Sequence, residues 1–394
     1  MRAVVWEGPR KLSVSDVPDP KIEAPTDAII KVTSSGICGS DLHLYEAMSA
    51  FMTPGDVMGH EPMGEVVEVG DDVKHIAVGD RVVVPFNISC GRCFMCDRGF
   101  QSQCETTQVT EYGSGAALLG YTKLYGQVPG GQAEYLRVPM AHYGPIKVPD
   151  GPPDDRFVYL SDVLPTAWQA VLYADVPIGG SVAVVGLGPI GDMATRVALK
   201  RGAGTVIGLD RVPERLARAS RNGVAVINTD ACDDLAAAVK DMTDGRGADS
   251  VIDAVGMEAH GNPVARTVRA ATTLLPDAVT EKLMRTAGID QLAALTTAIE
   301  LVRRGGTLSI SGVYGGMADP MPMLTMFDKQ LTIRMGQANV RRWVDELMPL
   351  VLDDADPLGL ESFATDHVLL EQAPQAYQDF MNKENGTVKV LLRP

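Results

Sequence analysis

Four cysteines gather in one short stretch of the chain, and their spacing suits a metal ion. They are Cys90, Cys93, Cys96 and Cys104, in the pattern Cys-x2-Cys-x2-Cys-x7-Cys. Four thiolates on one loop can surround a tetrahedral zinc ion and leave no coordination position open. In a chain of 394 residues, the cysteines of a disulfide framework would be spread along the sequence. These four lie close together instead. The spacing therefore predicts a structural zinc site.

A glycine-rich turn follows the apolar run 181–185, and residues 190–200 have a helical pattern. The turn contains Gly186, Gly188, Pro189, Ile190 and Gly191. In this arrangement Gly186 permits the tight turn, Gly188 lets the backbone approach a pyrophosphate, and Gly191 lets the helix pack on the strand. The positive end of the helix then faces the phosphates. The turn therefore predicts dinucleotide binding.

A second strand-like run ends at Asp210, which lies 19 residues after Gly191. A carboxylate at this distance accepts hydrogen bonds from the adenosine ribose and repels a 2′-phosphate. Asp210 therefore favours NAD. Arg211 could instead turn toward a phosphate, so the phosphorylated cofactor stays an alternative.

Two further turns each offer one zinc ligand between glycines. Cys38 lies between Gly36 and Gly39, and His60 follows Gly59. A catalytic zinc site needs three protein ligands and one open position. These two turns supply only two ligands, and a lone cysteine or histidine more often packs in a core. The residues by themselves leave metal binding here open.

The elements that must position these residues fall into two patterns. A chain of 394 residues exceeds the usual size of one core and so predicts two domains. The first 150 residues predict a strand-rich, barrel-like unit, with strands near 28–32, 64–69 and 80–84. From about Pro165, strands alternate with helices, as in a parallel sheet with crossover helices. Further elements are expected at 205–209, 213–221, 248–254, 307–311, 331–335, 343–352 and 387–392. The segment from about 338 onward is either a third unit or a return to the first.

Charge and composition exclude several classes of partner. The chain has 35 Lys plus Arg against 50 Asp plus Glu, a net charge of -15, so nucleic acid and anionic membranes are repelled. A nucleic-acid zinc ribbon is disfavoured for the same reason. The N-terminal residues lack the apolar core of a signal peptide, and no apolar run reaches about 18 residues. We expect a cytoplasmic protein.

The motifs, taken in their order along the chain, resemble the zinc-containing medium-chain alcohol dehydrogenase family. Residues 59–73 resemble the zinc signature of that family. The resemblance implies an α/β protein: a chaperonin-10-like β-barrel catalytic domain at 1–162 and a Rossmann domain with a doubly wound parallel sheet at 163–336. Residues 337–394 would return to the catalytic domain. It also implies NAD, two zinc ions per subunit, and a homodimer or homotetramer.

Many members of the family supply a cysteine as the third catalytic ligand, but Asp162 stands at that place here. The same departure occurs in the subgroup of glutathione-independent formaldehyde dehydrogenase and formaldehyde dismutase, and in some secondary alcohol dehydrogenases. The latter often lack the four-cysteine loop, which this chain keeps. Residues 130–135 and 257–290 also resemble the formaldehyde subgroup. Residues 257–290 are either an insertion over the cofactor or a surface excursion.

The resemblance also implies roles for individual residues. Cys38, His60 and Asp162 would hold the catalytic zinc. Ser40 would take the alcohol proton and pass it through the nicotinamide ribose toward His43, near bulk water. Glu61 would be either a carboxylate behind the ligands or a transient fourth ligand.

Three functions follow, in decreasing order of support. The first is an oxidoreductase that transfers a hydride between a small alcohol or aldehyde hydrate, such as that of formaldehyde, and NAD. The second is an NAD(P)-linked secondary alcohol or polyol dehydrogenase of the same family. The third, a non-catalytic zinc- and nucleotide-binding structural protein, is disfavoured because Cys38, His60 and Asp162 are all present.

Overall fold

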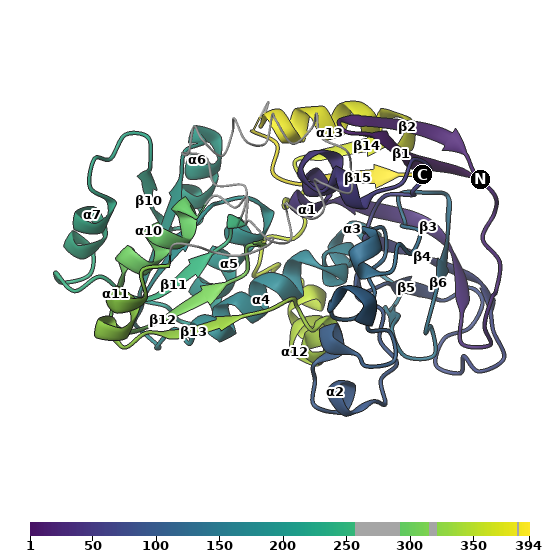
Figure 1. Ribbon diagram of the computed structural model, residues 1–394, viewed down its shortest axis with the longest axis horizontal. Coiled ribbons are helices and arrows are strands. Elements are labelled where there is room, and N and C mark those ends of the chain that lie inside the picture. Colours follow the sequence, from purple (N-terminus) through teal and green to yellow (C-terminus); the bar gives the residue numbers. More distant parts are fainter. Residues whose placement is uncertain (257–291, 315–320, 384–385) are drawn as a thin grey trace. The chain divides into compact units, whose positions relative to one another are not determined.

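The computed structural model describes residues 1–256, 292–314, 321–383 and 386–394. The chain forms two compact units (Figure 1): Met1–Pro165 together with Ala338–Pro394, and Thr166–Gln337. These divisions lie a few residues after those expected at 162 and 336. The expected insertion at 257–290 lies outside the described residues. Among the described helices, none is long and apolar enough to cross a membrane.

The first unit contains a seven-stranded sheet in the order β14-β15-β3-β4-β5-β7, with β6 paired to β3, and a separate pair of β1 and β2. Every second residue at the start of β3, namely Ala28, Ile30 and Val32, is buried in one core cluster, as the alternation of a half-buried strand requires. The strands are β1 (Arg2–Gly8), β2 (Lys11–Asp16), β3 (Ala28–Ile37), β4 (Glu61–Val69), β5 (Arg81–Val83), β6 (Tyr135–Val138), β7 (Ile146–Lys147), β14 (Asp366–Leu369) and β15 (Val390–Arg393).

The C-terminal segment contributes two strands to this sheet. β15 pairs antiparallel with β3, so that Val390 lies opposite Ile37, and it pairs in parallel with β14. The C-terminal segment therefore joins the first unit and does not form a third one. The helices of this unit are α1 (Gly39–Leu42), α2 (Phe94–Asp97), α3 (Asp154–Phe157), α12 (Val340–Leu352) and α13 (Ala373–Asn382), and α4 (Val163–Ala174) leads into the second unit.

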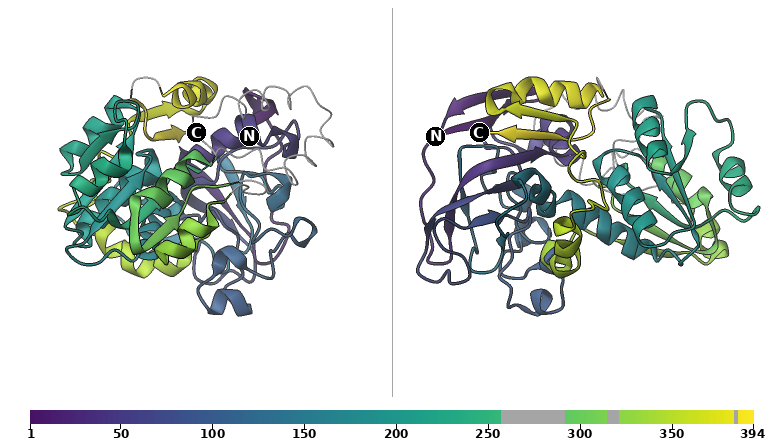
Figure 2. Two further views of the ribbon diagram at one scale, coloured as in Figure 1. Left: turned by 60° about the vertical axis from the view of Figure 1, so that its left-hand side comes forward. Right: turned by 180° about the vertical axis from the view of Figure 1, so that it is seen from behind.

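The second unit is built on a six-stranded sheet in the order β10-β9-β8-β11-β12-β13, with every pair parallel. This strand order is that of the doubly wound Rossmann fold, which confirms the predicted fold class. The views in Figure 2 show the sheet together with its helices. The elements are β8 (Ser181–Val185), α5 (Pro189–Lys200), β9 (Thr205–Asp210), α6 (Pro213–Arg221), β10 (Ala225–Asn228), α7 (Leu235–Asp241), β11 (Ala248–Asp253), α10 (Ala293–Leu301), β12 (Val302–Ile310), α11 (Met323–Lys329) and β13 (Thr332–Met335).

Both faces of this sheet are covered. Ala183 and Val185 of β8 lie in a core cluster that also holds residues of α7 and α10. Val182 and Val184 point to the opposite face because side chains alternate along a strand, and they too are fully buried. A parallel strand buried on both faces is continuously apolar, and 181–185 has this pattern. The prediction of a strand there is confirmed.

Candidate active site

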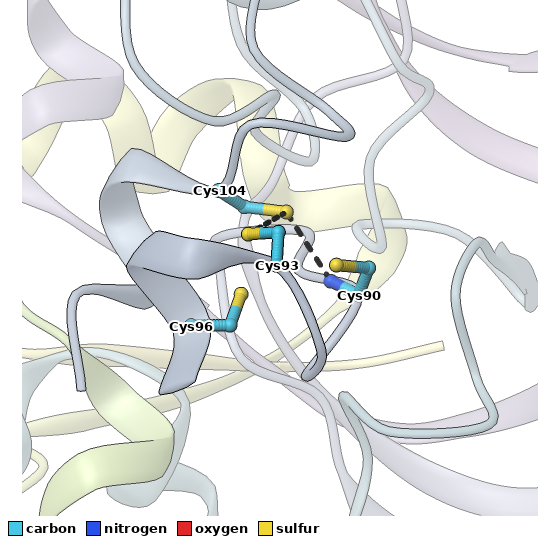
Figure 3. A group of neighbouring side chains, drawn as sticks. All are labelled: Cys90, Cys93, Cys96 and Cys104. Carbon is cyan, nitrogen blue, oxygen red and sulfur yellow. Dashed lines mark hydrogen bonds between the residues drawn. The ribbon is translucent and has the colours of Figure 1, made fainter. Parts of the chain in front are cut away.

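The four-cysteine loop brings its sulfur atoms together, as Figure 3 shows. One ligand atom from each of the cysteines lies within 4.8 Å of all the others. The Sγ atoms of Cys93 and Cys104 are 3.9 Å apart. Zn–S bonds of about 2.3 Å in a tetrahedron require S···S distances of about 3.8 Å. The loop therefore has the dimensions of a closed zinc site.

Backbone and side-chain donors point at these sulfur atoms. The backbone N–H groups of Cys90 and Glu105 donate to Cys104 Sγ at 3.3 Å and to Cys93 Sγ at 3.4 Å. The Thr106 hydroxyl donates to Cys90 Sγ at 3.1 Å. Burial alone would raise the pKa of Cys93, but the N–H groups of Cys96 and Glu105 lower it to about 6. Such donors stabilise thiolates, the form that binds zinc.

A second group assembles from distant parts of the chain. Cys38 follows β3, His60 and Glu61 lie at the start of β4, and Asp162 precedes α4. The four side chains are buried, and their ligand atoms lie within 4.8 Å of one another. Asp162 Oδ2 is 3.5 Å from Cys38 Sγ and 3.5 Å from His60 Nε2.

These spacings suit a shared metal ion. Zinc in a tetrahedral site binds sulfur at about 2.3 Å and nitrogen or oxygen at about 2.0–2.2 Å, which gives S···O and N···O distances of about 3.4–3.6 Å. The two distances of Asp162 fall in this range. Cys38, His60 and Asp162 also supply the sulfur, nitrogen and oxygen donors that zinc accepts. The three donors therefore fit a zinc ion, and three protein ligands leave a fourth coordination position, with Glu61 nearby.

The electrostatics of the group favour a cation. Burial, together with the carboxylates of Asp162 and Glu61, raises the pKa of Cys38 to about 11. Burial lowers the pKa of His60, but Asp41 and Asp162 overcome this and raise it well above the ordinary value. An ion at the centre would compensate the carboxylates and displace the thiol proton.

Asp41 fixes the direction of the His60 ring. Asp41 Oδ1 lies 2.9 Å from His60 Nδ1, so that Nε2 is the nitrogen that faces Asp162. A carboxylate behind a metal-binding imidazole sets its tautomer and orientation. The hydroxyl of Ser40 lies 3.2 Å from the same Nε2. Ser40 therefore lies beside the nitrogen atom that faces Asp162.

Glu61 pairs with a buried lysine that sequence analysis did not identify. Glu61 Oε2 forms an ion pair with Lys389 Nζ, and neither side chain has exposed surface. Lys389 Nζ also donates to the carbonyl of Ile37 at 3.1 Å. A Cβ atom on Gly36 would overlap Glu61 Oε2, so a glycine is needed opposite Glu61 in the β3–β4 pair.

The position of His43 differs from the expectation that it lies near bulk water. Its side chain is only 6% exposed. The residue lies in the helical turn His43–Ala47 directly after α1, and this turn packs against its neighbours in the first unit. The helical turn buries the imidazole, which a reading of isolated motifs could not foresee.

The glycine-rich turn has the geometry that the sequence requires. Gly186 has a φ of 87°, where a side chain is strained, and a Cβ atom on Gly191 would overlap the carbonyl oxygen of Gly186. Gly188 precedes α5, and Pro189 and Ile190 form its first turn. Among the residues that the structure describes, and apart from the chain neighbours of Gly188, the only atom within 4 Å of a Cβ placed on Gly188 belongs to the Arg215 guanidinium. The N-terminus of α5 is thus approachable by a phosphate.

Asp210 ends β9 beside this turn. Its carboxylate accepts hydrogen bonds from the backbone N–H groups of Leu187 at 2.7 Å and Val212 at 2.9 Å. Arg211 is turned away and pairs with Asp230 at 3.1 Å. The end of β9 therefore carries the Asp210 carboxylate, with the guanidinium of Arg215 3.9 Å from it.

Sequence analysis assigned no role to four buried residues of the first unit: Asp41, Gln132, Tyr377 and Lys389. One of them carried a signal, since Lys389 interrupts the otherwise apolar run of residues 388–392. A cation in such a strand needs a buried partner. Asp41 and Gln132 lie in segments that the resemblance already included, but only the contacts distinguish them from their neighbours.

Comparisons with known proteins agree with this architecture. Residues 24–150 match the family model "Alcohol dehydrogenase GroES-like domain", and residues 189–275 match "Zinc-binding dehydrogenase". A zinc-type alcohol dehydrogenase-like protein of Bacillus subtilis is 40% identical over 100% of both chains. Formaldehyde dismutase of Pseudomonas putida is 34% identical over 96% of this chain and 94% of its own. Among solved structures, an alcohol dehydrogenase from Thermus sp. ATN1 has a TM-score of 0.83 and 34% identity, over 100% of this chain and 99% of that one.

Proposed function

This chain belongs to the zinc-binding medium-chain alcohol dehydrogenase family, and we propose that it oxidises small aldehyde hydrates or alcohols, formaldehyde in first place, with NAD. Family membership makes it an oxidoreductase for an alcohol or aldehyde with zinc and a nicotinamide dinucleotide. The observation that supports the proposed site is the placement of Asp162 Oδ2 at 3.5 Å from both Cys38 Sγ and His60 Nε2.

In the proposed mechanism the three ligands present an open coordination position. Zinc bound there would act as a Lewis acid that eases loss of the substrate proton, as it lowers the pKa of bound water to about 7, and NAD would accept the hydride. Ser40 is placed to take the substrate proton, because its hydroxyl lies 3.2 Å from the ligating nitrogen of His60. His43, buried one turn further along, would receive that proton within the protein. Aromatic rings of Phe86 and Tyr121 flank His60 at 6.3 and 6.2 Å and limit the access of water.

The substrate proposal rests on three observations. Asp162 stands where many family members have a cysteine, as in the formaldehyde subgroup. The four-cysteine loop is retained, which disfavours the secondary alcohol dehydrogenases that share the aspartate. A protein named formaldehyde dismutase is 34% identical over nearly the whole length of both chains. Hydrated formaldehyde is a geminal diol, so one hydroxyl can bind as an alcohol does while the carbon gives up hydride and yields formate.

The remaining details are also proposals. NAD is preferred to NADP because the Asp210 carboxylate stands at the end of β9 while Arg211 pairs with Asp230. Two zinc ions per subunit are proposed because there are two groups whose ligand atoms lie within 4.8 Å of one another. One group is the four cysteines, and the other contains Cys38. A homodimer or homotetramer is proposed from the family alone.

The test is to incubate the purified protein with ¹³C-formaldehyde and a catalytic amount of NAD, without glutathione, and to quantify formate and methanol by NMR. Formate in proportion to the NADH formed supports a dehydrogenase. Equal formate and methanol support a dismutase, in which NADH reduces a second aldehyde before it leaves. The Cys38→Ser variant is the control and should give neither product.

A different result would contradict the proposal. If the wild-type protein holds zinc and yields neither product, yet rapidly oxidises secondary alcohols or polyols with NAD or NADP, the substrate assignment is wrong. Absorbance at 340 nm in a screen of such alcohols supplies this measurement.

A further inference from the structure

Behind the Cys38 and His60 ligands lies a buried chain of polar contacts that ends on the C-terminal segment. The Gln132 side-chain amide donates to Asp41 Oδ2 at 3.4 Å and to the carbonyl of Gly36 at 3.1 Å. Its oxygen accepts from the Tyr377 hydroxyl at 2.9 Å. Asp41, Gln132 and Tyr377 have no exposed surface. Three residues from distant parts of the sequence thus form one network away from water.

The network has only one possible direction. A backbone carbonyl and a carboxylate can only accept, so the NH2 group of Gln132 must face Gly36 and Asp41. The amide oxygen is then left toward Tyr377, which must donate its proton. Gly36 and Asp41 therefore set which way the amide of Gln132 points, and the Tyr377 hydroxyl holds the amide oxygen in place by donating to it.

Asp41 connects this network to both neighbouring ligands. Its Oδ2 accepts the backbone N–H of Cys38 at 2.9 Å, and its Oδ1 lies 2.9 Å from His60 Nδ1. A rotation of the carboxylate would disturb the thiol ligand and the imidazole ligand together. The hydrogen bond from the Gln132 side-chain amide to Asp41 Oδ2 opposes such a rotation.

Backbone contacts hold Gln132 against the segment that carries His60. The N–H of Gln132 donates to Met58 at 2.9 Å, and the N–H of Gly131 donates to Gly59 at 2.8 Å. A Cβ atom on Gly59 would lie 2.8 Å from the backbone nitrogen of Gln132, so only glycine fits there. The residue before His60 therefore rests directly on Gln132.

We propose that Gln132 and Tyr377 are positioning residues for the metal site: Tyr377 anchors the oxygen of the Gln132 amide, the amide holds the Asp41 carboxylate, and Asp41 holds His60 and Cys38 in ligand geometry. Neither residue touches the substrate or the metal. The inference rests on the proposed function, because it takes the Cys38, His60 and Asp162 group to bind zinc. Changes to such outer partners typically cost about 10–100-fold in metal affinity or activity.

The test compares zinc-loaded Tyr377→Phe and Gln132→Met with the wild-type protein. Both changes remove hydrogen bonds and keep much of the side-chain volume. We expect a chelator to remove one of the two zinc ions about tenfold faster from Tyr377→Phe, and faster still from Gln132→Met, while the zinc of the four cysteines leaves at the wild-type rate. After cobalt substitution, the absorption bands of the catalytic site should change in both variants, because they report ligand geometry.

Tyr143→Phe is the matched control. Tyr143 accepts a hydrogen bond from Gln101 at 3.0 Å in the same unit, and it is not one of the hydrogen-bond partners of Asp41 and Gln132 described above. This variant should keep the wild-type cobalt spectrum and the wild-type loss of the catalytic zinc. The control shows whether the loss of any tyrosine hydroxyl has the same effect.

The outcomes separate positioning from packing. Lower thermal stability with unchanged metal loss and an unchanged cobalt spectrum in Tyr377→Phe would overturn the inference, even if Gln132→Met failed to fold. The same changes in Tyr143→Phe would overturn it as well. A wild-type protein with zinc at the four cysteines alone would overturn the proposed function and, with it, this inference, a result distinct from the first two.

Discussion

The two groups of potential zinc ligands in the first unit are built in opposite ways. The four-cysteine loop takes all its ligands from residues 90–104, and its sulfur atoms receive hydrogen bonds from residues 90, 105 and 106. The group at Cys38 takes ligands from residues 38, 60 and 162 and is supported by Gln132, Tyr377 and Lys389. One is complete within a loop, and the other exists only after the sheet has formed.

This difference has an energetic reason. A closed four-cysteine site gains its stability from the metal and orders the loop around it. The assembled group instead holds desolvated ionisable side chains whose cost the rest of the unit must offset. A site that keeps one position open for substrate needs such external support, since its own ligands do not close it. The comparison predicts different responses to substitution.

The largest effect is expected from Cys38→Ser at the assembled group. Loss of the thiolate should remove the catalytic zinc and lower kcat/KM by about a thousandfold, which corresponds to about 4 kcal/mol of transition-state stabilisation. The fold should persist, because serine occupies nearly the same buried volume. Elemental analysis should give one zinc per subunit. Two zinc ions and normal turnover in this variant would show that the ligands are assigned wrongly.

Cys96→Ser should show the reverse pattern. Loss of the structural zinc should lower the free energy of unfolding by about 4 kcal/mol and the Tm by about 10 °C, because the loop then lacks the ion that orders it. Calorimetry and solubility measure this effect. The activity of the fraction that remains folded should fall much less than in Cys38→Ser. If Cys38→Ser and Cys96→Ser lose stability equally, the assignment of one structural and one catalytic zinc site is wrong.

Lys389→Met tests how much the buried charges of the assembled group affect the free energy of unfolding. The change leaves the buried Glu61 carboxyl without its cation and should destabilise the protein by about 3 kcal/mol. Burial raises the pKa of Glu61 and Lys389 opposes this, so the pKa rises further in the variant. Glu61 would then be protonated when folded and ionised when unfolded, so the stability of the variant should fall as the pH rises.

The matched double variant combines Lys389→Met with Glu61→Gln. It removes both charges, so it should recover most of the stability and lose the pH dependence that comes from Glu61. Chemical denaturation between pH 5 and pH 9 provides the measurement. If the double variant is no more stable than Lys389→Met, the unpaired Glu61 carboxyl is not the cause of the stability lost in Lys389→Met.

The smallest effect is expected at Asp210, which lies in a site built from nearby residues like the four-cysteine loop. Asp210→Gly should shift the ratio of catalytic efficiencies with NAD and NADP by about tenfold toward NADP, because the repulsion of a 2′-phosphate is lost. Asp210→Asn is the control that removes the charge, keeps the side-chain size and keeps one of the two acceptor oxygens that Leu187 and Val212 use. A wild-type protein that prefers NADP would instead make Arg211 the dominant group.

The sequence by itself was most informative where ligands and turns are close in the chain. The spacing of Cys90, Cys93, Cys96 and Cys104 predicted a cluster that the structure shows as a compact group of sulfur atoms. The turn from Gly186 to Gly191 and the run 181–185 predicted a strand, a tight turn and a helix, and all three are present. Such features depend on local backbone geometry, which a few residues specify.

Only the tertiary structure decided which residues support the Cys38 group. Lys389 and Tyr377 are more than 300 residues from Cys38 in the chain, and their contacts arise because β15 pairs with β3 and α13 packs with β15. His43, which the sequence placed near water, is buried as well. Burial and hydrogen bonding between distant segments depend on the complete fold. A motif can therefore name a ligand, but the unit as a whole determines what holds that ligand in place.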